Sequence, residues 1–191
     1  HAHYKSAVAE GAGRGMAMGY WINAGMQSSA TLNVIADGHV SILTGSPDIG
    51  GSRASMALMA SEVLGIPFEH IHPQVAATDA VGHTDLTGGS RTTLATGQAV
   101  IQAAEQCVVE MCRRAAAEWN VEPGVVAWSQ GAAHYGDQSL AFEELAQRAG
   151  AMGGPLTFSS SLTATSTAPG FGVHICDAEV DKETGRTTIT R

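Results

Sequence analysis

The alternation of hydrophobic and polar positions predicts two β-hairpins. Apolar or small residues occupy every second position from Ser28 to Ala36 and again from Val40 to Thr44, on either side of Asp37-Gly38. A period of two around an Asp-Gly pair is typical of antiparallel strands joined by a tight turn. A second pair of strand-like segments, Gly172 to Val180 and Thr187 to Arg191, predicts another hairpin near the end of the sequence.

Helical spacing is clearest in two other segments. Apolar residues repeat at intervals of three and four from Ser52 to Leu64 and from Gln98 to Trp119. Gly65 and Asn120 follow these segments, as expected where helices end. A shorter helix is expected from Phe142 to Ala149, and short strands are expected at 71–77, 125–128 and 134–135. This mixture predicts a mixed α+β (α/β) fold.

Two stretches of small residues interrupt these patterns. Residues 78–96 are rich in Gly, Ser, Thr and Asp, and such a long loop inside a folded chain is usually functional. Gly150 to Gly170 is expected to be an irregular linker. We therefore expect a first lobe at about 13–150, a linker at about 150–170 and the start of a second lobe at about 171–191.

Composition excludes several classes of protein. The 191 residues are 44% hydrophobic, which favours a folded chain, and the net charge of −8 disfavours a nucleic-acid partner. Apolar runs stop well short of the ~20 residues of a membrane-spanning helix. The three cysteines include no Cys-x-x-Cys pair, so buried thiols in a reducing cytoplasm are expected.

Two glycine-rich loops carry the candidate chemistry. Gly45 to Arg53 follows a predicted strand and opens a helix, and Thr87 to Thr93 precedes the long helix. Gly-Gly-Ser-Arg occurs in both, at 50–53 and 88–91. Glycines allow backbone N–H groups to approach an anion, and the helix N-terminus supplies further donors. Two such loops suit one extended ligand with several polar or phosphate groups, although spacing alone explains them equally well as helix-capping turns.

Other polar residues give weaker hypotheses. His70 and His72 are predicted to share one face of a strand, but no third ligand follows at a recognisable spacing for a metal. Asp79, His83 and Asp85 lie in the long loop, where solvated polarity is the simpler interpretation. The Gly-x-Ser-x-Gly motif of many hydrolases is not found, and no carboxylate pair is placed by helical spacing. No catalytic residue and no metal ligand is therefore assigned.

Several motifs become specific when they are taken in order. They are Gly13-Arg-Gly-Met-Ala-Met-Gly19, Asp37-Gly38-His-Val40, Thr44-Gly-Ser-Pro-Asp-Ile-Gly50, Ser61-Glu-Val-Leu-Gly-Ile-Pro67, Thr87-Gly-Gly-Ser-Arg-Thr-Thr93, Thr96-Gly-Gln-Ala-Val100 and Phe171-Gly-Val-His. In this order they resemble the molybdenum-binding large subunit of the xanthine dehydrogenase, aldehyde oxidase and carbon monoxide dehydrogenase family. The resemblance covers nearly the whole chain from about Gly13.

The resemblance implies a fragment of the second molybdopterin-binding region of that subunit. In this family the two loops wrap a molybdopterin cofactor that carries molybdenum, in bacterial members usually in its cytosine dinucleotide form. The residues carried over as cofactor-binding are Gly50, Gly51, Ser52, Gly88, Gly89, Ser90, Arg91, Thr92 and Thr93. Gly89 falls where the family places a small residue beside the metal and the substrate.

The implied reaction is hydroxylation of a small molecule at a carbon next to nitrogen or oxygen, with water as the oxygen source. Electrons then pass to [2Fe-2S] clusters and FAD on partner subunits. The family's catalytic Glu lies in a motif further along than Arg191, so we expect a fragment that is inactive alone and joined to the rest of a large subunit. We also expect a partner strand at the edge of the hairpin that ends at Arg191.

Two alternatives remain at this stage. The family's first loop commonly has Gln or Thr between its glycines, whereas Gly50-Gly51-Ser52 lacks that side chain. This departure favours a structural or interaction fragment that no longer binds cofactor, whereas the intact segment from Ser90 to Thr93 favours the binding role. An unrelated phosphate-binding enzyme would rest on the two loops alone.

Overall fold

Two units make up the chain in the computed structural model, which describes residues 4–165 and 168–191. The first unit comprises residues 23–167, and the second combines residues 1–22 with 168–191. Both contain strands and the first also contains helices, so the predicted mixed α+β class is confirmed. Within the described residues, no helix combines the length and the apolar character that crossing a bilayer requires.

A four-stranded sheet forms the centre of the first unit, in the order β4-β3-β2-β8. Its strands are β2 (Met26–Val34), β3 (Val40–Thr44), β4 (Ile71–Val75) and β8 (Leu156–Ala164). β2 runs antiparallel to both β3 and β8. The predicted hairpin is confirmed, and Gly38 turns it with a φ of 85°. β4 is parallel to β3, because a helix carries the chain back between them.

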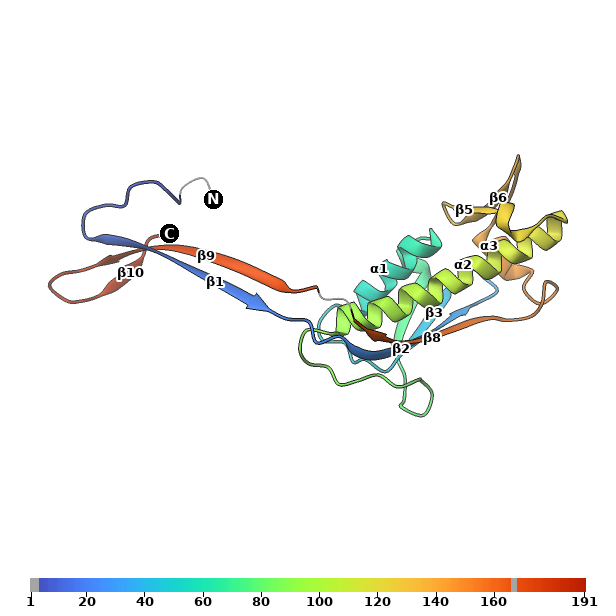
Figure 1. Cartoon of the computed structure of the whole chain (residues 1–191), viewed down its shortest axis with the longest axis horizontal. Coiled ribbons are helices and arrows are strands. Elements are labelled where there is room, and N and C mark those ends of the chain that lie inside the picture. The colour runs from blue at the N-terminus through green and yellow to red at the C-terminus, as the bar shows by residue number, and fades with distance from the viewer. Residues whose placement is uncertain (1–3, 166–167) are drawn as a thin grey trace. The chain divides into compact units, whose positions relative to one another are not determined.

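Helices α1 (Ser52–Leu64) and α2 (Gly97–Trp119) lie over one face of this sheet (Figure 1). Both predicted helices are therefore confirmed. The sheet turns alternate residues such as Leu32 and Ile42 into the core beneath them. Alanines fill much of the helix interface, and a Cβ added at Gly97 would lie 2.5 Å from the Met59 sulfur. Small residues thus let the two helices pack closely.

A second, smaller sheet packs beyond the end of α1. It contains β5 (Ala127–Ser129), β6 (Ala132–Tyr135) and β7 (Gln138–Ala141), and α3 (Phe142–Gln147) follows it. Its Trp128 donates a hydrogen bond of 3.1 Å to the Leu64 carbonyl and meets Phe142 edge to face. Short 3₁₀ turns, Phe68–His70 and Pro123–Val125, precede β4 and β5.

The second unit is an antiparallel ribbon in the order β1-β9-β10. Its strands are β1 (Ala12–Trp21), β9 (Gly170–Val180) and β10 (Thr187–Ile189). The second predicted hairpin, β9 and β10, is confirmed. Arg14 and Asp177, which face each other across β1 and β9, form a bidentate ion pair with distances of 2.5 and 2.7 Å.

The structure corrects the linker expected from Gly150 to Gly170. Leu156–Ala164 within it is strand β8, paired along its whole length with β2. Its sequence resembles a linker because the residues it buries include small or polar ones such as Ser160 and Ala164. Residues 166–167 lie outside the described part. The lobe boundaries stay a prediction, and β1 of the expected first lobe pairs with β9 of the expected second lobe.

Glu110 on α2 is held between two arginines. Arg113 donates to it at 2.6 and 2.8 Å, and the buried Arg114 donates at 2.8 Å. Arg114 also donates to the carbonyls of Ala149 and Gly154, which ties the turn before β8 to the helix. The Arg113 hydrogen bonds, assisted by Arg114, lower the pKa of Glu110 to about 2.

We predict that Glu110→Gln lowers the free energy of unfolding by about 1.5 kcal/mol at neutral pH, the scale of a hydrogen bond to a charged group. Because the folded-state pKa lies below the ordinary value of 4.5, this stabilisation is complete above pH 4.5 and is lost as the pH falls towards about 2. The difference between the variant and the parent should therefore shrink in urea titrations at acidic pH. Glu105→Gln, an exposed change on the same helix, is the control, and an equal difference at both pH values would contradict the prediction.

Candidate functional site

The second glycine-rich loop enters α2 through a π-helical turn, Thr92–Thr96. Wide turns of this kind are frequent at functional sites. Gly89 and Ser90 both have positive φ, at 64° and 57°. A Cβ added at Gly89 would lie 2.7 Å from the Ala24 Cβ, and Ala24 N–H donates to the Gly89 carbonyl. The loop is therefore held tightly against the segment before β2, and glycine is required at position 89.

Arg91 is completely buried beneath this loop. It donates hydrogen bonds to the carbonyls of Gly25, Gln27, Asp85 and Leu86 and to the Ser28 hydroxyl. A guanidinium has five N–H donors, and these five oxygens engage them. The side chain therefore fixes the loop on β2 and leaves no donor for direct contact with a ligand. Burial lowers the pKa of Arg91, and the neighbouring Asp85 opposes that shift.

A chain of buried hydroxyl groups connects the two loops. The Ser28 hydroxyl, which accepts from Arg91, lies 3.1 Å from the Thr96 hydroxyl. The Thr96 hydroxyl lies 2.7 Å from that of Ser46, at the start of the first loop. All four residues are buried, so the contacts are shielded from water. The positions of the two loops are thus linked through β2 and the π-helical turn that precedes α2.

Thr92 presents a buried hydroxyl without a hydrogen-bond partner among the described residues. It borders a hollow of about 350 Å³ lined by Ile49, Thr87, Gly88, Ser90, Arg91, Thr92 and Thr93. Ile49 belongs to the first loop, so both loops reach the same hollow. An unpaired buried hydroxyl is unfavourable, and a polar ligand atom in the hollow would satisfy it.

The first loop already holds an anion of its own. Gly50 and Gly51 have φ values of 98° and 90°, which turn their backbone around the Asp48 carboxylate. This carboxylate accepts hydrogen bonds from Gly50 N–H, from Ser52 N–H and hydroxyl, and from the Arg53 side chain, at 2.9 to 3.2 Å. The Arg53 and Ser52 side chains lower the pKa of Asp48 well below its usual range. The predicted anion cradle exists, but Asp48 fills it.

Sequence reasoning missed the part that Asp48 plays. The available indication was an acidic side chain just before the start of a helix, where the helix dipole favours negative charge. Ser52, expected to contact a ligand, instead donates to Asp48. Among the nine carried-over residues, five of the second loop line the 350 Å³ hollow and Gly89 does not. Gly51 lines a separate hollow with Asp48 and Arg53.

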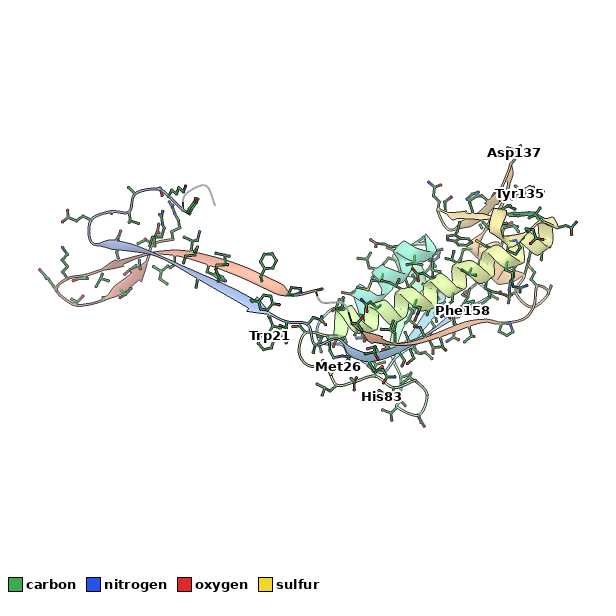
Figure 2. All side chains as sticks on the ribbon, in the orientation of Figure 1. Trp21, Met26, His83, Tyr135, Asp137 and Phe158 are labelled. Atoms are coloured by element: carbon green, nitrogen blue, oxygen red, sulfur yellow. The ribbon has the colours of Figure 1, made fainter. Side chains whose placement is uncertain are left out.

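The weaker candidates do not gather at this hollow. Asp85 accepts from Gln27 N–H at 2.7 Å and so anchors the long loop, on which His83 is labelled in Figure 2. The ring of His39 lies 4.8 Å from that of His70 and 5.4 Å from that of His72. Across residues 4–165 and 168–191, no group of three or more His, Cys, Asp or Glu side chains is arranged to hold a metal ion.

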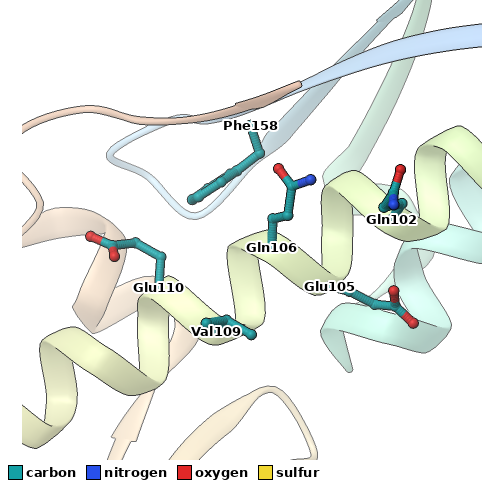
Figure 3. A pocket seen from close by; sticks show the side chains of 6 residues that line it. All are labelled: Gln102, Glu105, Gln106, Val109, Glu110 and Phe158. Carbon is teal, nitrogen blue, oxygen red and sulfur yellow. The ribbon is translucent and has the colours of Figure 1, made fainter. Parts of the chain in front are cut away.

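Another hollow, of about 440 Å³, lies between α2 and β8 (Figure 3). Its lining residues are Gln102, Glu105, Gln106, Val109, Glu110 and Phe158. None of the predicted site residues borders it. The candidate site is therefore the hollow that the second loop and Ile49 share.

Comparison with protein families gives the class of the chain. Residues 2–191 match the model of the molybdopterin cofactor-binding domain, and the chain belongs to this family. The xanthine dehydrogenase of Drosophila pseudoobscura pseudoobscura is 40% identical over 81 residues, which cover 42% of this chain and 6% of the relative. The xanthine dehydrogenase of Calliphora vicina is 37% identical over 81 residues, with the same coverage of both chains. The matched segment is thus a small part of each relative.

Solved structures show the same fold. A carbon monoxide dehydrogenase from Oligotropha carboxidovorans matches 94% of this chain with a TM-score of 0.86 and 23% identity. Quinoline 2-oxidoreductase from Pseudomonas putida 86 matches 94% with a TM-score of 0.81 and 19% identity. The chain covers 25% and 26% of these two proteins, respectively.

We predict that Thr92→Val leaves the stability of the ligand-free chain unchanged or raises it by up to about 1 kcal/mol, because the change removes an unsatisfied hydroxyl at nearly constant volume. Thr96→Val is the matched control on the same turn. It should destabilise the chain by about 1 to 3 kcal/mol, because Ser28 and Ser46 both lose a partner. Urea unfolding measures both, and a large loss in Thr92→Val would show that its hydroxyl has a structural partner.

We predict that Arg91→Lys lowers the free energy of unfolding by about 3 kcal/mol, although it keeps the charge, because an ammonium group cannot reach five separated acceptors. Arg53→Lys, a change in the more exposed arginine of the first loop, should cost about 1 kcal/mol or less. Chemical denaturation of the two variants tests the difference. Similar losses would contradict the structural role of Arg91.

Proposed function

We propose that this chain is the cofactor-binding part of a molybdenum hydroxylase. Its ligand in this proposal is a molybdopterin cofactor in the cytosine dinucleotide form, carrying molybdenum. The cofactor, when bound, supplies the oxidation of a C–H bond of an aldehyde or N-heterocycle with oxygen taken from water. The chain itself contributes binding and placement, and no acid or base of this chain is assigned to the reaction.

The observation that carries the proposal is the unpaired, buried hydroxyl of Thr92, a residue that lines the hollow that both loops border. The residues there suit a polar, anionic ligand. Gly88 lines the hollow without a side chain, and Ser90 and Thr93 bring hydroxyl-bearing side chains to it. Membership of the molybdopterin-binding family supports the identity of the ligand.

Arg91 has an indirect part in this proposal. Its guanidinium holds the loop through carbonyl and hydroxyl oxygens, none of which carries a full negative charge. The Arg91 charge borders the hollow and favours an anion there, although the nearby Asp85 carboxylate offsets part of it. Gly50, Gly51 and Ser52 would join the binding of the same ligand only after Asp48 leaves their donors.

The proposal also covers the other polypeptides and cofactors with which this chain would work. We propose that the rest of the large subunit supplies the catalytic Glu, that [2Fe-2S] and FAD subunits take up the electrons, and that the complex works in the cytoplasm. The chain spans about 6% of the curated relatives and about a quarter of the solved ones, which is consistent with a share of a larger particle. A structural fragment without cofactor is the alternative, and the filled first loop favours it.

The test is native mass spectrometry with elemental molybdenum analysis on the complex purified from its source. We expect about one molybdenum per complex for the parent, and about tenfold weaker cofactor retention for Thr92→Val, the equivalent of about 1.4 kcal/mol. Thr93→Val removes the neighbouring hydroxyl, which belongs to a more exposed residue, and is analysed in the same way as a second variant of this site. A complex that lacks molybdenum and cofactor in the parent would establish the structural alternative.

A further inference from the structure

The ribbon of the second unit has two different faces. In β1 and β9, residues directly opposite each other point to the same side of the sheet. Three successive cross-strand pairs on one side are entirely apolar: Met16 with Ile175, Met18 with Val173, and Tyr20 with Phe171. The Arg14–Asp177 ion pair follows them on the same side. One face of the ribbon is therefore a continuous hydrophobic ladder.

Nothing within the second unit covers this hydrophobic ladder among the described residues. Met16 is 66% exposed, Met18 77%, Tyr20 67% and Phe171 83%. Contiguous apolar patches of this kind mark interaction surfaces in soluble proteins. A narrow ribbon without a hydrophobic core is also only marginally stable on its own. Both facts indicate that another surface covers the ladder.

On the opposite face of the ribbon, β1 presents small residues from Gly13 to Gly19, whereas β9 adds His174 and Cys176. Gly13, Gly15, Ala17 and Gly19 alternate with the ladder residues along β1, and Gly172 faces Gly19. These glycines have no positive φ, and a Cβ added to any of them would meet nothing within 4 Å. Glycine inside a strand weakens it, and neither backbone strain nor a contact with a described residue of this unit requires it here. This independent observation points to a backbone that approaches the ribbon closely from outside.

Charge supports an apolar protein partner. Residues 1–22 and 168–191 contain five basic and five acidic residues, so this unit is neutral and the net charge of −8 lies in the other unit. The Arg14 and Asp177 side chains neutralise each other at the end of the ladder. A second copy of the chain would bring two units of −8 together, which opposes self-association.

We propose that the part of a molybdopterin-binding large subunit that this chain does not contain covers the ribbon, with an apolar surface on the hydrophobic ladder and a backbone segment against the glycine face. Solved relatives carry the same fold over 94% of this chain within polypeptides of which it covers 25%. The occupant is therefore a complementary polypeptide of the same family, and the proposal rests on the proposed function for that identity.

A photo-cross-linking amino acid at Phe171, in the tagged full chain expressed in the source organism, identifies the occupant. We expect cross-linked peptides to come from a polypeptide of the molybdopterin-binding family, outside the residues of this chain. Cross-links between two copies of this chain, to an unrelated protein, or to none would overturn the proposal.

Two variants test the two faces separately. Met18→Asp places a charge on the hydrophobic ladder, and Gly15→Val adds a side chain to the glycine face. We expect each variant to reduce, by about tenfold, the amount of complex recovered between this chain and the proposed polypeptide partner. Gly15→Val should leave the thermal stability of the isolated chain unchanged or higher, since its Cβ meets open space and valine favours strands.

Gly124→Val is the matched control, because Gly124 also has ordinary φ and open space but lies in the other unit. It should leave the complex intact. Full recovery of the complex with Met18→Asp or Gly15→Val would overturn the assigned face. Molybdenum analysis of the same particles separates the two proposals. A complex that forms without molybdenum would support the interface and contradict the proposed cofactor binding. A complex that contains molybdenum but is unaffected by both variants would support cofactor binding and contradict the interface.

Discussion

The buried guanidinium of Arg91 is the interaction on which the site depends. It joins the start of β2 to the long loop, more than 60 residues further along the chain, and ties the second glycine-rich loop to the preceding residues Asp85 and Leu86. Removing a charged group from water is costly unless its donors are all engaged, and here five oxygens of the chain meet that requirement. Because most of these oxygens are backbone carbonyls, the side chain determines the course of the backbone. The hydroxyl groups of Ser28, Thr96 and Ser46 extend this order to the first loop.

Hydrophobic periodicity was sufficient to predict the elements that bury large apolar side chains. The hairpin around Gly38 and the two long helices follow directly from it. Periodicity failed at β8, where the buried positions include Ser160 and Ala164, because small residues carry little hydrophobic contrast. β1 was also missed as a strand, since its alternation of glycine with large side chains faces solvent rather than a core.

The candidate site was predictable only in outline. Glycine content drew attention to the second loop, and the structure places that loop directly before α2. Spacing cannot tell which hydrogen-bond donors the chain itself uses. Arg91 and Ser52 were both expected to face a ligand, and both donate to the protein. Their partners lie up to 66 residues away or depend on a turn that two glycines in the left-handed region create. Thr92 stands out only after the other hydroxyl groups have been matched with partners.

The Asp48 carboxylate gives the first loop a built-in competitor. An anion that approaches Gly50 and Ser52 meets donors already occupied by a group tethered two to four residues away. Such a tether corresponds to an effective concentration on the order of millimolar or higher, which a weakly held monoanion in solution does not overcome. A ligand already anchored at the second loop is itself tethered and competes on equal terms. If the proposed ligand binds, the second loop therefore engages it first, and the first loop engages it only after Asp48 has left its donors.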